Sequence, residues 1–104
     1  MISLIEEKRQ GLSELCARYS VKRLELFGSA ADGTFKTGHS DLDFLVEFGD
    51  IPDDAHADHY FGLWYGLRDL FDMPVDLVVA SVMRNPYFIA AVNQSRTMVY
   101  DAAA

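Results

Sequence analysis

Residues 40–48 read SDLDFLVEF and carry the strongest structural signal in the chain. Apolar side chains occupy every second position from Leu42 to Phe48, which predicts a β-strand with one face buried. Asp41 and Asp43 must then project together from the opposite face of that strand. Residues two apart on a strand lie about 6.6 Å apart, so both carboxylates can reach one or two bound ions.

A Gly28-Ser29 pair precedes this strand in the sequence. It ends an alternating strand predicted over residues 23–27 and comes before a short helix expected over residues 30–33. Glycine allows a ligand to approach the backbone closely, and a helix N-terminus offers unpaired N–H groups and the positive end of the helix dipole. Together with the serine hydroxyl, these groups suit a phosphate oxygen.

Asp76 is a third acidic candidate, because it interrupts the apolar run of residues 74–79 within a strand predicted over residues 73–80. An acid among apolar neighbours costs free energy unless it lies at an exposed sheet edge or has a partner. A metal ligand or a general base explains this position, and an exposed edge acid is the structural alternative. Three carboxylates near a phosphate site favour magnesium, a hard cation that prefers oxygen ligands, and so predict nucleotide chemistry.

The rest of the chain alternates helical and extended patterns without internal repeats. Amphipathic stretches and capping residues predict three further helices, and a short strand follows the last of them. The helices are expected over residues 3–19, 56–71 and 86–94, and the strand over residues 97–100. We therefore predict an α/β fold of the α+β type, with a small mixed sheet, helices packed on one face and the three aspartates on the other.

Composition limits the classes of protein to which the chain can belong. Its 104 residues predict a single domain, 1–104, without a second substrate-binding lobe. Sixteen acidic and nine basic residues give a net charge of −7, which argues against a nucleic-acid partner because polyanions are repelled. Cys16 is the one cysteine, and neither a leader nor a membrane-length apolar run is visible. We expect a cytoplasmic protein with no membrane association, and an oligomer remains one open alternative.

Taken in order, the Gly28-Ser29 turn, the Asp41-x-Asp43 pair and the strand residue Asp76 resemble the minimal nucleotidyltransferases of the DNA polymerase beta superfamily. The resemblance covers nearly the whole chain and implies the nucleotidyltransferase fold. It also implies a site that uses two Mg²⁺ ions to transfer a nucleoside monophosphate from a triphosphate to an acceptor. Gly28 and Ser29 would hold the terminal phosphates. Asp41 and Asp43 would bridge both ions, and Asp76 would complete the catalytic metal site.

Short members of this family resemble the antitoxins of toxin–antitoxin pairs in which the toxin is a HEPN-type protein. These antitoxins silence their toxin by adenylylating one of its tyrosines. The resemblance thus implies ATP as the substrate, a protein hydroxyl as the acceptor and a HEPN-type toxin as the partner. Two alternatives stay open at this point. One is a non-catalytic antitoxin that neutralises its partner by binding alone, and the other is a small-molecule nucleotidyltransferase.

One position departs from the family pattern. Members commonly read Gly-Ser-x-Ala-Arg-Gly, whereas residues 28–33 read GSAADG and place Asp32 where the arginine usually stands. A negative charge there repels a triphosphate, so reduced nucleotide affinity or a lost activity is the consequence to test. Lys36 or an arginine from a partner could compensate for this charge. Within the chain, Lys36, Arg68 and Arg84 are the basic candidates for phosphate contact.

Overall fold

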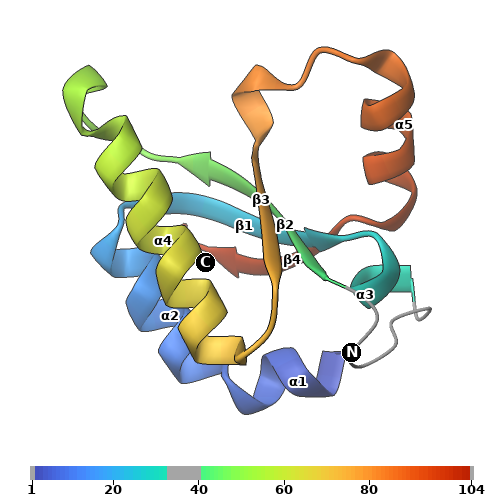
Figure 1. Cartoon of the computed structure of the whole chain (residues 1–104), viewed down its shortest axis with the longest axis horizontal. Helices are drawn as coiled ribbons and strands as arrows, with labels where there is room; N and C mark the ends of the chain where they lie inside the picture. The colour runs from blue at the N-terminus through green and yellow to red at the C-terminus, as the bar shows by residue number, and fades with distance from the viewer. Residues whose placement is uncertain (1, 33–40, 104) are drawn as a thin grey trace.

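The computed structural model describes residues 2–32 and 41–103. Within these residues four strands form one mixed sheet in the order β3-β2-β1-β4 (Figure 1). Strand β1 runs antiparallel to both of its neighbours, β2 and β4, whereas β2 and β3 are parallel. The mixed sheet predicted from the sequence is therefore confirmed. The strands are β1 Val21–Phe27, β2 Leu42–Phe48, β3 Val75–Val79 and β4 Thr97–Asp101.

The helices follow the predicted order with one difference. The expected N-terminal helix is two helices, because Lys8 leaves the helical conformation with φ −108° and ψ 13°. This break changes the direction of the chain between α1 and α2 (Figure 1). The predicted cap of the last helix is confirmed. The Asn85 side chain, immediately ahead of that helix, accepts hydrogen bonds from the backbone N–H groups of Tyr87 and Phe88 in its first turn. The helices are α1 Ile2–Glu7, α2 Arg9–Arg18, α3 Ser29–Asp32, α4 His56–Phe71 and α5 Pro86–Ser95, with single 3-10 turns η1 Asp53–Ala55 and η2 Ala80–Val82.

The main core lies between the sheet and helices α1, α2 and α4. Apolar side chains that alternate along β1, β2 and β3 face this layer, and none of the largest is more than a few per cent exposed. Helices α2 and α4 approach each other closely because Gly66 faces Leu15, whose Cδ1 would lie 2.3 Å from an added Cβ. The sheet side of the core consists of Val21, Leu24, Leu26, Leu42, Phe44, Val46, Val75, Leu77 and Val99.

Helix α5 packs on the opposite face of the sheet, where a smaller cluster joins Phe27, Leu45 and Val92. The rings of Phe27 and Phe88 meet edge to face with centroids 6.0 Å apart. Because alternate residues of β2 share a face, Asp43 lies on the same side of the sheet as Leu45. The sheet face predicted to carry the aspartates is therefore partly covered by α5, which packs on Leu45, two residues after Asp43.

Two side chains of α4 cap the outer edge of β3, the strand at one end of the sheet. Tyr60 Oη donates a hydrogen bond to Leu77 O at 2.5 Å, and Trp64 Nε1 donates to Val75 O at 2.8 Å. Unpaired edge carbonyls favour association with another strand, so these bonds both satisfy the carbonyls and protect the edge.

No helix in the described ranges has the length and apolar character needed to span a membrane.

Tyr60→Phe removes only the hydroxyl that bonds Leu77 O. We expect the free energy of unfolding to fall by about 1 kcal/mol, because a carbonyl loses its partner in a half-buried position. Chemical denaturation followed by tryptophan fluorescence measures this change. Tyr65→Phe is the matched control, since Tyr65 is 57% exposed on the same helix, and it should change stability by less than about 0.5 kcal/mol. Equal effects of the two substitutions would contradict the edge-capping role.

Candidate active site

The parallel pairing of β2 and β3 places Asp43 directly opposite Asp76. Register partners on adjacent strands project from the same face, and their strands lie about 4.8 Å apart. Asp43 is half-buried and Asp76 is exposed. Asp41 immediately precedes β2 and is also exposed. The sheet thus brings together the two strand aspartates predicted from the sequence, with Asp41 at the entrance to the same strand.

Crowding of these acids changes the ionisation of the central one. The pKa of Asp43 is raised to about 6, first by burial of its carboxyl group and then by the negative charges of Asp76 and Asp41. Both neighbours are therefore close enough to influence Asp43 electrostatically. A carboxylate in this setting is stabilised by any cation that enters the site.

Gly28 connects β1 to α3 beside these acids. Its φ of +71° lies in the left-handed region, where residues with a Cβ are strained. A Cβ at Gly28 would also lie 2.4 Å from Asp43 Oδ2, which is too close for any real contact. Glycine is thus required here both for the turn and for the approach of the Asp43 carboxylate. Ser29, the other predicted phosphate ligand, is the first residue of α3 and is half-buried.

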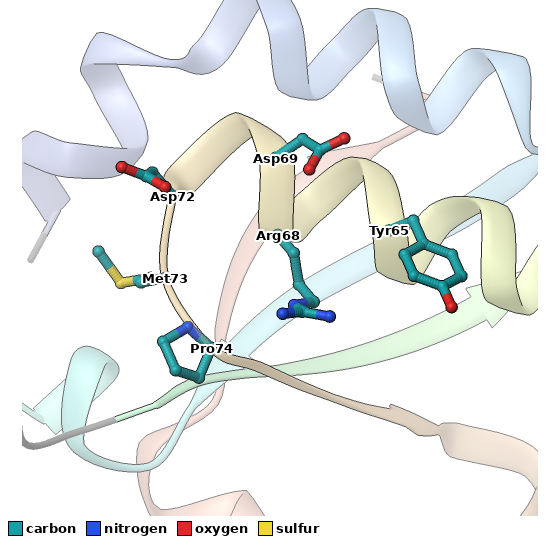
Figure 2. Close-up of a pocket in the computed structure, with 6 residues that line it drawn as sticks. All are labelled: Tyr65, Arg68, Asp69, Asp72, Met73 and Pro74. Carbon is teal, nitrogen blue, oxygen red and sulfur yellow. The ribbon is translucent and has the colours of Figure 1, made fainter.

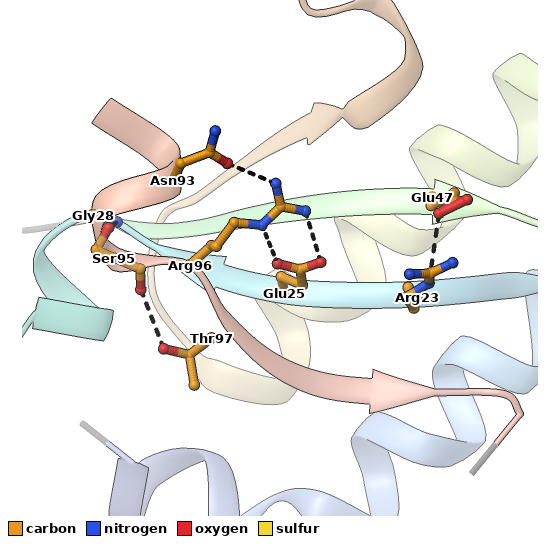
Figure 3. Close-up of polar contacts among 8 residues, drawn as sticks. All are labelled: Arg23, Glu25, Gly28, Glu47, Asn93, Ser95, Arg96 and Thr97. Carbon is orange, nitrogen blue, oxygen red and sulfur yellow. Dashed lines mark hydrogen bonds and ion pairs between the residues drawn. The ribbon is translucent and has the colours of Figure 1, made fainter. Parts of the chain in front are cut away.

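The Gly28 N–H, just ahead of the first residue of α3, is not free. It donates a hydrogen bond of 2.9 Å to Ser95 Oγ at the end of α5 (Figure 3). Sequence reasoning did not find Ser95, because the two residues are 67 positions apart and no local motif marks this serine. It also did not find that Tyr60 lies near the site, where burial and then the charge of Asp76 raise the pKa of the Tyr60 hydroxyl.

The donor set fits a hard divalent cation in its chemistry, because it consists of carboxylate oxygens whose mutual repulsion a cation relieves. A preformed metal site would need several such ligands close together. Among the described residues, no three His, Cys, Asp or Glu side chains are grouped closely enough to hold a metal ion.

Both described basic candidates, Arg68 and Arg84, make contacts with other groups. Arg68 projects from α4 beside β3 (Figure 2). Its guanidinium stacks over the Trp64 ring, 4.8 Å from the ring centroid. Arg84 donates to two backbone carbonyls of its own turn, Ser81 O and Met83 O. Lys36 and the loop predicted around it lie outside the described residues.

Two cavities of the described structure lie away from the chemistry. One, of about 310 Å³, is lined by residues of the α4 end and the β3 start, including Arg68 (Figure 2). The other is a mainly apolar groove of about 640 Å³ near the far end of β2, where Phe61 and Val82 are exposed. Neither of these two cavities is lined by Asp43 or Asp76.

This arrangement is supported by comparison with known proteins. Residues 8–99 match the nucleotidyltransferase domain family. A curated relative from Methanocaldococcus jannaschii, “Putative protein adenylyltransferase MJ0128”, is 38% identical over 77 residues, which make up 74% of this chain and 74% of that protein. The chain therefore belongs to the nucleotidyltransferase domain family, as the glycine turn and aspartate pattern predicted.

Solved structures narrow the similarity to the minimal nucleotidyltransferases (MNT). One described as a “putative minimal nucleotidyltransferase” superposes with a TM-score of 0.71 at 28% identity, covering 88% of this chain and 89% of that one. A chain from the complex of a tri-AMPylated Shewanella oneidensis HEPN toxin with its MNT antitoxin gives a TM-score of 0.62, covering 95% of this chain and 74% of that one. At 18% identity, this second likeness concerns the fold alone.

Gly28→Ala should lower the free energy of unfolding by about 2 kcal/mol, because the new Cβ is strained at positive φ and forces the Asp43 carboxylate to rotate away. In an Asp43→Ala background the cost should fall to about 1 kcal/mol, since the Asp43 Cβ lies at an ordinary 3.6 Å from the added methyl group. Urea titrations of the four proteins in this cycle measure the coupling. Strict additivity would show that the two residues do not constrain each other.

Asp43→Asn should stabilise the metal-free protein by about 1 kcal/mol at pH 8. The folded-state pKa of about 6 lies above the ordinary value of 3.8, so ionisation of Asp43 opposes folding. This penalty is complete above about pH 6, shrinks as the pH falls and is absent below about pH 3.8, where both states are protonated. Thermal unfolding in EDTA across this range should show the stabilisation disappear toward acid pH. A pH-independent difference would contradict the assigned shift.

Proposed function

We propose that the chain is a magnesium-dependent adenylyltransferase that transfers AMP from ATP to a tyrosine hydroxyl of a HEPN-type toxin and so acts as its antitoxin. The observation that carries the proposal is the register that sets Asp43 beside Asp76, next to the Gly28 turn. Family membership supports nucleotidyl transfer. The relative named as a protein adenylyltransferase supports a protein acceptor, and the complex with an AMPylated HEPN toxin supports this class of partner.

Asp41, Asp43 and Asp76 would hold the magnesium ions in this proposal. Bound magnesium supplies charge neutralisation for the phosphates and for the developing charge on the leaving group. The raised pKa of Asp43 supports the role, because a carboxylate surrounded by other acids gains most from a cation. Of the three acids, Asp43 is the most buried, and so it is the one whose substitution should weaken metal binding most.

In this proposal, side chains of the chain itself activate the acceptor and orient the phosphates. A tyrosine hydroxyl has an unperturbed pKa near 10, so its attack at neutral pH requires a base. Asp76 is exposed, so the hydroxyl of a protein acceptor can reach it and transfer its proton. The acceptor oxygen then forms a bond to the α-phosphorus of ATP while the bond to the pyrophosphate oxygen breaks. Gly28 and Ser29 would orient the terminal phosphates that leave.

Asp32 favours a second candidate function, a non-catalytic antitoxin. An acid at the position usually held by arginine repels the triphosphate and favours a protein that neutralises its partner by binding alone. Exposed aromatic side chains of α5 are consistent with a binding surface, with Tyr87 85% exposed and Phe88 37% exposed. The two candidates differ in what happens when the catalytic acids are removed.

Asp43→Asn and Asp76→Asn should each reduce AMP transfer at least about 1,000-fold, because each removes a charge that the transition state requires. The assay incubates the purified chain with labelled ATP, Mg²⁺ and a HEPN-type toxin, and it detects label on the toxin. EDTA should abolish transfer by the unmodified chain.

Asp69→Asn is the matched control for this experiment, since Asp69 is an exposed acid on α4 and lies away from the three aspartates. It should leave transfer within about twofold of the unmodified chain. Full transfer by either active-site variant defeats the proposal. Neutralisation of the toxin without any transfer establishes the non-catalytic alternative, and label on a small molecule in place of the toxin identifies the small-molecule enzyme.

A further inference from the structure

The junction between α5 and β4 is tied to the Gly28 turn by a serine that local sequence patterns do not mark. Ser95 Oγ accepts the Gly28 N–H at 2.9 Å, in a partly buried position. The Ser95 carbonyl in turn accepts a hydrogen bond of 3.1 Å from Thr97 Oγ1 (Figure 3). The Ser95 backbone is therefore fixed through its carbonyl, while its hydroxyl group binds the Gly28 turn.

The residue after Ser95 fixes this junction to the sheet. Arg96 makes a two-pronged contact with Glu25 on β1, through Nε to Oε2 at 2.6 Å and Nη2 to Oε1 at 2.9 Å (Figure 3). The same guanidinium donates to Asn93 Oδ1 at 2.8 Å. Two-pronged contacts between arginine and a carboxylate restrict geometry strongly, so the position of Ser95 relative to β1 is well defined. The hydrogen bonds from Arg96 also lower the pKa of Glu25.

Gly28 is anchored on both sides of its backbone as a result. Its N–H is bound to Ser95 Oγ, and its carbonyl accepts the Ala31 N–H at 3.1 Å. Glycine at φ +71° has many other conformations available to it, because it lacks a Cβ. The bond from Ser95 selects one of them, namely the conformation in which Gly28 contacts Asp43 and α3 begins at Ser29.

We propose that Ser95 is a positioning residue for nucleotide binding, an inference that rests on the proposed function of the Gly28-Ser29 turn. By holding Gly28, Ser95 keeps the turn in a single arrangement relative to Asp43 before the nucleotide arrives. A turn that is already ordered loses less conformational entropy on binding a ligand. Ser95 itself touches neither ATP nor the acceptor in this scheme, and its effect is transmitted through the Gly28 backbone.

The variant Ser95→Ala tests this role by removing the acceptor for the Gly28 N–H. We expect the affinity for AMP-PNP in the presence of Mg²⁺ to fall about fivefold, equivalent to about 1 kcal/mol and typical of one lost hydrogen bond. The KM for ATP should rise by a similar factor while kcat changes by less than about twofold, because an ordered turn assists ground-state and transition-state binding alike. Isothermal titration and steady-state transfer assays supply these values.

Two further variants separate positioning from a general loss of structure. Ser95→Thr retains the hydroxyl and should restore nucleotide affinity to within about twofold of the unmodified chain. Ser13→Ala removes an exposed hydroxyl from α2, on the other side of the sheet, and should leave affinity unchanged. Circular dichroism and thermal unfolding confirm that the variants are folded at the assay temperature. Equal loss of affinity in Ser95→Ala and Ser95→Thr overturns the proposal.

Hydrogen exchange of the Gly28 amide gives a readout that does not depend on activity. The amide should exchange at least about tenfold faster in Ser95→Ala than in the unmodified chain, as measured by NMR. If the unmodified chain binds AMP-PNP normally, two results for Ser95→Ala would overturn the role of Ser95: an unchanged exchange rate of the Gly28 amide, or an unchanged affinity for AMP-PNP. Either result would leave the proposed function standing. Failure of the unmodified chain to bind AMP-PNP defeats the proposed function, and the role of Ser95 falls with it.

Discussion

The parallel register between β2 and β3 is the constraint on which the rest of the structure depends. It sets Asp43 beside Asp76 on one face of the sheet, while Phe44 and Leu77 pair on the other face. A shift of one residue would turn the acids into the core and the apolar side chains into solvent. Burial of Phe44 and Leu77 under α4 therefore holds the acids together against their own repulsion.

The site destabilises the fold locally, and the surrounding contacts offset that cost. Asp43 is half-buried among other acids, and Gly28 adopts a conformation that favours glycine alone. Close to these features lie the Arg96 contact with Glu25, the Ser95 contact with Gly28 and the small apolar cluster between α5 and the sheet. This combination is typical of a functional site, in which strain and like charges persist because well-packed neighbours hold them in place.

Local patterns predicted most of the fold because the apolar alternation is unambiguous. Strand β2 was expected over the range observed, and the Asn85 cap and the Gly28 turn were found at their predicted places. The N-terminal helix was predicted as one piece, since neither glycine nor proline marks the break at Lys8. Roles of the individual site residues remain predictions, although the proximity of Asp41, Asp43 and Asp76 agrees with them.

By itself, the sequence determined which residues are available for chemistry and which face of each strand carries them, because side-chain direction follows from alternation along the backbone. Only the tertiary structure decided which distant residues meet. Ser95 reaches Gly28 across 67 positions, and Tyr60 reaches the β3 edge, because α5 and α4 pack on opposite faces of one sheet. Such contacts depend on packing between elements, and no local periodicity encodes them.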